Sequence, residues 1–172
     1  MLYIKHYQSP LGAMTMSSNG EALTGLWFDS SQQNSSFSQW AKREKANNFS
    51  KVFEEAEEWL NIYFSGKVPN FIPNISLVGN EFRKAVWDIL LSIPYGEIMT
   101  YGEIADKIAK ERGIKRMSAQ AVGGAVSHNP ISLIVPCHRV VGKNGKLTGY
   151  AGGIDKKLEL LRLEGVDTSK MV

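Results

Sequence analysis

The chain has a single cysteine, Cys137, which lies between a proline and a histidine in the stretch IVPCHRVVG at residues 134–142. A free thiol has a pKa of roughly 8.5, so it is a weak nucleophile at neutral pH unless its surroundings activate it. The apolar run at residues 131–135 predicts a buried strand, and apolar burial would raise the thiol pKa further. Cys137 is therefore either an inert core residue or an activated nucleophile.

Two other residues could activate this thiol. His138 follows the cysteine directly, but a lone Cys-His pair is more often structural, because adjacent residues of a strand point to opposite faces. Glu164 is expected at the C-terminal end of a last helix that Asp155 caps, where the helix dipole disfavours a carboxylate. Glu164 must then be solvated, or it has a cationic or hydrogen-bonding partner.

A glycine-rich segment, GYAGG at residues 149–153, lies between the cysteine and this glutamate. Glycines allow the backbone to approach a ligand closely, and Tyr150 offers an aromatic ring for stacking. The alternative interpretation is that this segment is a plain glycine-rich connection and not a ligand-binding loop. Just before this segment, Asn144 and Gly145 predict a tight hairpin turn.

Capping signals upstream of the cysteine predict three helices, of which the last two form a helix-turn-helix. Asn80 caps the first helix. The second opens at a capping box, TYGE at residues 100–103, and continues through about Ala109. A basic segment, KERGIKR at residues 110–116, leads to the third helix, which Ser118 caps.

The third helix, SAQAVGGAVS, consists almost entirely of small residues. Its adjacent glycines, Gly123 and Gly124, each cost roughly 1 kcal/mol in a helix interior, so something should offset them. One explanation is close packing against a neighbouring element, and the other is a thin helix that enters a DNA groove. Only Gln120 could contact base edges, so such a helix should bind DNA with little sequence preference.

The first 76 residues predict a separate small unit, with a domain boundary near residue 76. Alternating apolar residues predict three short antiparallel strands, at residues 3–9, 13–18 and 22–28. A polar stretch at residues 30–48 is expected to be a loop or a poorly formed helix, and a helix should start near Ser50 and end at Gly66. The expected fold class is α/β of the α+β type, with this unit at residues 1–76 and a helical, winged helix-turn-helix-like domain at 77–172 that carries the cysteine.

Composition excludes several classes of protein. No apolar run approaches the roughly 20 residues of a membrane span, and the N-terminus does not have the pattern of a signal peptide. A single cysteine cannot form an intramolecular disulfide, which fits a reducing cytoplasm, and one cysteine with three histidines disfavours a structural zinc site. Residues 1–76 have a net charge of −1 and residues 77–172 have +4, so the second part suits an anionic partner such as nucleic acid.

Taken together, PCHRV, the upstream AVGGAV and HNP and the downstream GYAGG and LLRLEG resemble the O6-alkylguanine-DNA alkyltransferase family. The resemblance is strong over residues 80–165 and extends to the N-terminal part only in outline. It implies that Cys137 accepts an alkyl group from O6 of guanine. His138 would act as the base through a water molecule, with Glu164 holding the imidazole in the correct tautomer.

The resemblance implies further properties. The partner would be double-stranded DNA containing O6-alkylguanine, whose nucleotide is flipped into a pocket. Each molecule would act once, because a thioether is not hydrolysed in water. It would act as a monomer and without a cofactor or metal. The implied substrate-binding residues are Tyr101, Asn129, Val140, Tyr150, Ala151 and Gly152. The expected DNA-binding residues are Lys115, Arg116, Ser118, Ala119, Gln120 and Gly123.

The chain departs from the family pattern at two positions. Gln120 stands where many members have an arginine that fills the space left by the flipped base, so DNA affinity should be weaker while flipping survives. Ala151 replaces the serine of some members, but only its backbone is needed. The basic segment at residues 110–116 is longer than in some members and could add phosphate contacts.

Three other functions fit the sequence less well. An alkyltransferase-like protein that only binds lesions would lack the cysteine, whereas Cys137 is present in its full PCHRV setting. A redox-sensing regulator usually exposes its cysteine and has a second one to resolve it. A cysteine hydrolase would require an acyl pocket, and inertness toward small acyl esters would exclude that class.

Overall fold

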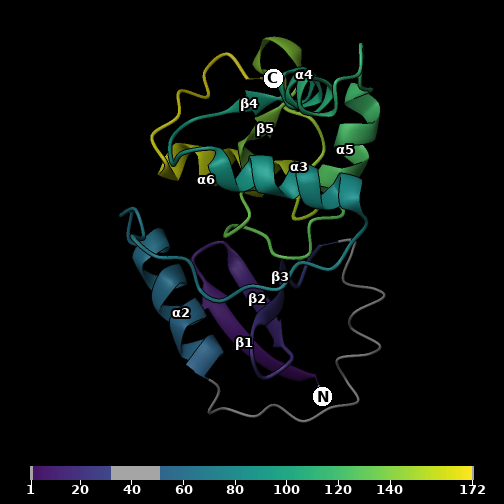
Figure 1. Ribbon diagram of the computed structural model, residues 1–172. Coiled ribbons are helices and arrows are strands. Elements are labelled where there is room, and N and C mark those ends of the chain that lie inside the picture. Colours follow the sequence, from purple (N-terminus) through teal and green to yellow (C-terminus); the bar gives the residue numbers. More distant parts are fainter. Residues whose placement is uncertain (1, 32–50, 172) are drawn as a thin grey trace. The chain divides into compact units, whose positions relative to one another are not determined.

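The computed structural model describes residues 2–31 and 51–171, which divide into two compact units, Met1–Leu77 and Val78–Val172 (Figure 1). A small antiparallel sheet in the first unit and helices in both make this a mixed α/β fold, as predicted. In the part of the chain that is described, no helix is long and apolar enough to cross a membrane.

The first unit contains a three-stranded antiparallel sheet in the order β1-β2-β3, which confirms the three predicted strands. The strands are β1 (Tyr3–Ser9), β2 (Gly12–Ser18) and β3 (Leu23–Phe28). Tight turns join them because Gly12 and Gly20 adopt positive φ angles of 125° and 97°. Met14 and Met16 of the central strand are fully buried in the core of this unit.

Helix α2 (Lys51–Phe64) follows the sheet and contacts all three strands (Figure 1). Its apolar residues recur at the helical period, so one face is buried. The buried residues of α2 are Val52, Phe53, Ala56, Trp59, Leu60 and Tyr63. The prediction of a loop or weak helix at residues 30–48, and the predicted helix start at residue 50, fall almost entirely outside the described residues.

The second unit is built on helices α3 (Glu81–Ser92), α4 (Tyr101–Arg112) and α5 (Ala119–Ser127). The predicted caps of these three helices are present. The side chain of Asn80 accepts a hydrogen bond from the backbone of Arg83, the capping box of α4 is complete, and the Ser118 hydroxyl accepts from the Ala121 amide. Helix α4 continues three residues beyond the predicted end.

Helix α3 packs into the core of the second unit through one face. Trp87 is fully buried and its indole nitrogen donates to the Ala125 carbonyl of α5 at 2.9 Å, so it ties the first helix to the third. Phe82 is only half-buried and packs under the Arg112 guanidinium at 5.4 Å.

The apolar run at residues 131–135 is buried as predicted, but the predicted strand is wrong. The run forms a tight turn in which Leu133 has a φ of 70° and the Val135 amide donates to the Ile131 carbonyl at 3.1 Å. The Asn129 side chain determines this shape, because it bonds both the Ile131 amide, at 3.0 Å, and the Val135 carbonyl, at 2.8 Å. A short 3-10 helix, Cys137–Arg139, follows directly.

Two other local predictions need correction. The Asn144-Gly145 turn forms, with φ angles of 61° and 76°, but no antiparallel hairpin flanks it. Instead, β5 (Val140–Val141) pairs in parallel with β4 (Met99–Thr100). The last helix is α6 (Ile154–Leu163), and its capping residue is Gly153 rather than the predicted Asp155. Asp155 lies in the first turn, where its carboxylate interacts favourably with the helix dipole but does not cap the helix.

Candidate active site

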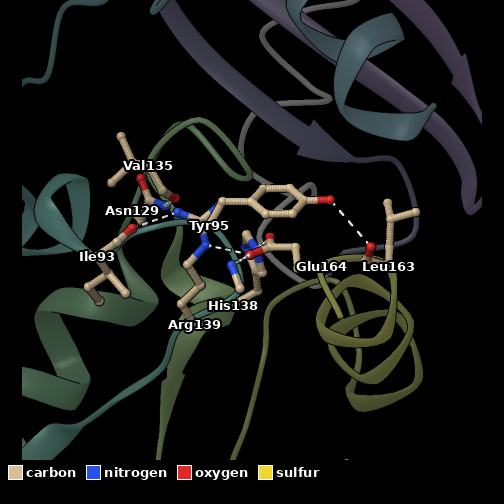
Figure 2. A network of polar contacts seen from close by, with 9 residues as sticks. Ile93, Tyr95, Asn129, Val135, His138, Arg139, Leu163 and Glu164 are labelled. Carbon is tan, nitrogen blue, oxygen red and sulfur yellow. Dashed lines mark hydrogen bonds and ion pairs between the residues drawn. The ribbon is translucent and has the colours of Figure 1, made fainter. Parts of the chain in front are cut away.

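Glu164 lies at the centre of a buried polar network (Figure 2). Its Oε2 contacts Nε2 of His138 at 2.5 Å, and its Oε1 accepts from Nε of Arg139 at 2.7 Å and from the Gly96 amide at 3.0 Å. The side chains of Glu164 and His138 are completely inaccessible to solvent. The sequence predicted that Glu164 is either solvated or has a cationic or hydrogen-bonding partner, and in the structure it has such partners.

Arg139 supplies the positive charge that this carboxylate requires, and the sequence did not indicate it as a site residue. Its Nη1 donates to the Ile93 carbonyl at 2.7 Å, and its guanidinium lies over the Tyr95 ring at 5.7 Å (Figure 2). The Tyr95 hydroxyl in turn donates to the Leu163 carbonyl at 3.3 Å. The α3–β4 connection, the cysteine segment and the end of α6 are thus joined around one ion pair.

The network determines the protonation states of Glu164 and His138. Burial alone would raise the pKa of Glu164, but the hydrogen bonds and charge that His138 and Arg139 supply lower that pKa to about 2. Burial lowers the pKa of His138 below its ordinary value, although the bond with Glu164 opposes this shift. At neutral pH the network therefore contains a carboxylate and a neutral imidazole that can accept a proton.

Cys137 is buried beside this network, with 7% of its surface exposed. Burial raises the pKa of the thiol, and the hydrogen bond from Asn129 and the positive charge of Lys157 oppose that shift. The resting form of this cysteine is therefore the thiol. A base is needed to generate the thiolate, and His138 is the next residue.

The chain is similar in sequence to proteins of known family. A family model described as 6-O-methylguanine DNA methyltransferase, DNA binding domain, matches residues 81–166, and one described as its ribonuclease-like domain matches residues 2–77. The chain belongs to the 6-O-methylguanine DNA methyltransferase family.

Relatives at the level of the whole chain agree with this assignment. The methylated-DNA–protein-cysteine methyltransferase of Mycobacterium tuberculosis is 43% identical over 95% of this chain and 93% of its own, and that of Methanosarcina acetivorans is 41% identical over 95% and 99%. The crystal structure of Mycobacterium tuberculosis OGT in complex with DNA is 41% identical, covers 94% of this chain and 92% of that chain, and has a TM-score of 0.79.

In this member of the methyltransferase family, several residues predicted to bind substrate gather around Cys137. Tyr101 is the first residue of α4. Burial raises the pKa of its phenol, the hydrogen bond from Thr148 opposes this shift, and the negative charge of a Cys137 thiolate adds to it. Tyr150 is half-buried with an inaccessible hydroxyl, and its pKa is raised well above the ordinary value, first by burial and then by the cysteine. Asn129 supports the turn before the cysteine, and Val140 follows its 3-10 helix. Ala151 and Gly152 continue the Tyr150 loop and are half-buried.

The residues predicted to bind DNA lie apart from this cluster, at the start of α5. Lys115, Arg116, Ser118, Ala119 and Gln120 are all exposed. Gly123 is different, because it lies against the active site: a Cβ added there would be 3.8 Å from the Tyr101 ring. Helix α5 therefore has one face toward the Tyr101 ring and one toward solvent.

Lys157 and Thr148 are further site residues that sequence reasoning missed. Lys157 is fully inaccessible, and its Nζ donates to the Val140 carbonyl at 2.6 Å. Its burial lowers its pKa to about 8. A signal existed, because Lys157, Leu160, Leu161 and Glu164 follow the spacing of one helical face, and all four are buried. Among the described residues, no group of three or more His, Cys, Asp or Glu side chains could hold a metal ion.

Proposed function

We propose that this chain repairs O6-alkylguanine in double-stranded DNA by transferring the alkyl group to Cys137, once per molecule. In the reaction the bond between the alkyl carbon and O6 breaks and a carbon–sulfur bond to Sγ forms. The observation that carries the proposal is a buried thiol followed by a neutral imidazole that a buried glutamate holds through Nε2, in a chain of this family.

The proton of the thiol would pass to His138. Because Nε2 is bonded to Glu164, Nδ1 is the ring nitrogen that would take this proton, through a water molecule. Glu164 remains ionised at neutral pH and would stabilise the imidazolium as it forms. The ammonium of Lys157, which opposes the rise in the thiol pKa, would stabilise the thiolate.

The leaving guanine acquires negative charge as its O6–alkyl bond breaks, and it needs a hydrogen-bond donor. Burial raises the pKa of Tyr101, so its phenol stays protonated at neutral pH and can donate. Tyr150, the Val140 region and the backbone of Ala151 and Gly152 would complete the pocket. The guanine anion would then take up one proton, which balances the one that the thiol gave to His138, and would become normal guanine again. The thioether is stable, so repair consumes the protein.

The target base lies inside a duplex, so the proposal includes extrusion of the nucleotide. Helix α5 would lie against the DNA, with the amide of Gln120 near the vacated position and with Lys115 and Arg116 on phosphates. We propose that one monomer carries out the reaction, because all the residues invoked lie in one unit of one chain.

Intact and peptide mass spectrometry tests this function after the protein is mixed with a duplex that contains one O6-methylguanine. The expected result is a gain of one methylene mass on the Cys137 peptide, which saturates at one per molecule. An unmodified duplex should give no gain, and Cys137→Ser should still bind the lesion without gaining mass. Tight binding of the lesion by the unaltered protein with no mass gain would make it a recognition protein instead.

A further inference from the structure

Thr148 makes a direct contact across the proposed pocket. Its Oγ1 donates a hydrogen bond to the phenol oxygen of Tyr101 at 3.0 Å. A phenol has one hydrogen to donate and two lone pairs that accept. Because one lone pair receives the Thr148 hydrogen, the hydrogen of Tyr101 itself must point elsewhere.

The protein holds Thr148 firmly in this place. Nζ of Lys157 lies 3.4 Å from the Thr148 carbonyl while it bonds the Val140 carbonyl, so it ties the loop to the segment after the cysteine. The Gly142 amide donates to the Lys146 carbonyl at 2.7 Å, which turns the chain back. Thr148 then packs so closely on Gly142 that a Cβ there would lie 3.2 Å from its methyl group.

Tyr101 has two other neighbours that matter for the proposed reaction. The ring lies beside Gly123 of α5, and the cysteine is near enough to affect its ionisation. The phenol is thus near both the helix proposed to contact DNA and the proposed alkyl acceptor. A base that enters between them would meet the phenol on the side that Thr148 does not occupy.

We propose that Thr148 is a positioning residue that acts through Tyr101, and that it aims the phenol hydrogen at the guanine in the pocket. This inference rests on the proposed function. Without the threonine hydroxyl, the O–H of Tyr101 can rotate and donate to another acceptor. That competing hydrogen bond must then be broken before the phenol can donate to the leaving base. The hydroxyl therefore affects the transfer step while it does not touch the reacting atoms.

The test is a double-mutant cycle on single-turnover methyl transfer from an O6-methylguanine duplex at saturating protein. The variants are Thr148→Val, which keeps the shape and removes the hydroxyl, Thr148→Ser, which restores it, Tyr101→Phe, and the double variant. Thr148→Val should slow transfer about three- to tenfold, which is the range of one neutral hydrogen bond. Thr148→Ser should recover most of the rate, and Thr148→Val should have no further effect in the Tyr101→Phe background.

A control reaction separates this role from a structural one. Alkylation of Cys137 by iodoacetamide without DNA should be equally fast in Thr148→Val and the unaltered protein, because that reaction does not use the phenol. Thr148→Ala serves as a second variant where Thr148→Val does not fold. An unchanged rate in Thr148→Val, or an equal loss with and without the Tyr101 hydroxyl, overturns the inference. A lack of transfer by the unaltered protein instead overturns the proposed function on which it rests.

Discussion

At the scale of residues, the site depends on how a buried carboxylate is compensated. Glu164, at the end of α6, bonds His138 and Arg139 of the cysteine segment and the Gly96 amide of the α3–β4 connection. A buried charge without partners costs several kcal/mol. The same contacts that make Glu164 tolerable therefore also hold the His138 ring in place.

Replacement of this carboxylate should affect both stability and transfer. Glu164→Gln would leave the buried Arg139 guanidinium without a counter-charge, so the free energy of unfolding should fall by about 3 kcal/mol. Methyl transfer should slow by about tenfold or more, because the amide cannot stabilise the imidazolium. Urea unfolding and single-turnover transfer measure the two effects.

Glu159→Gln is the matched control for this substitution. Glu159 pairs with Arg162 at 3.0 Å on the same helix, but both side chains are about half exposed. An exposed pair of this kind contributes roughly 0–1 kcal/mol, so this variant should unfold and react almost normally. Equal stability losses in the two variants would show that the buried network has no special role.

At the scale of elements, the glycines of α5 have separate explanations. Gly123 lies beside the Tyr101 ring, where a Cβ would make an ordinary contact at 3.8 Å, so packing favours a small residue at this position. Gly124 is exposed, and apart from its chain neighbours and the backbone of its own helix, no described atom lies within 4 Å of a Cβ placed on it. Packing inside this chain therefore does not explain Gly124, whereas the close approach of a duplex to α5 would.

Gly124→Ala should have opposite effects on stability and binding. It should raise the free energy of unfolding by roughly 0.5–1 kcal/mol, because alanine favours a helix and meets open space. It should also weaken binding to duplex DNA, measured by fluorescence anisotropy at constant salt. Unchanged affinity would mean that α5 does not approach DNA at this position.

Gly113→Ala provides the contrast at the end of α4. This glycine also has open space around its Cβ position among the described residues, but its φ is 63°. Alanine is strained in that conformation by about 1 kcal/mol or more. The same substitution should therefore destabilise the protein at Gly113 and stabilise it at Gly124, as thermal unfolding will measure.

At the scale of the whole molecule, charge and chemistry occupy the same part of the chain. The second unit contains the cysteine network and α5, and residues 77–172 have a net charge of +4. The exposed Lys115 and Arg116 directly precede α5. Contacts of such side chains with phosphates release counterions, so they make binding sensitive to salt.

The double variant Lys115→Ala/Arg116→Ala should lower the salt dependence of DNA binding. The slope of log K against log salt should decrease in magnitude by about 2, since each lost phosphate contact removes roughly 0.9. A matched pair, Lys51→Ala/Lys67→Ala, removes two exposed lysines from the first unit and should leave the slope unchanged. A parallel loss of slope in both pairs would contradict the assignment of these contacts to the α5 region.

Local sequence was sufficient for the parts of the fold that short-range physics determines. Helix caps such as Asn80, Thr100 and Ser118 satisfy backbone groups within three residues of themselves, so their side chains alone mark where the helices begin. The strands of the first unit are likewise set by alternation and tight turns. The PCHRV segment and its companion motifs also indicated the family, because they are short, contiguous patterns in the chain.

Tertiary structure decided what depends on partners distant in the chain. The apolar run before Cys137 has the composition of a strand, but Asn129 bonds it into a turn instead. The roles of Arg139 and Thr148 could not be predicted because their partners, the Ile93 carbonyl and the Tyr101 hydroxyl, are more than forty residues away in the chain. A buried polar group needs a hydrogen-bond partner, but sequence spacing does not say which of many distant groups folding will bring to it.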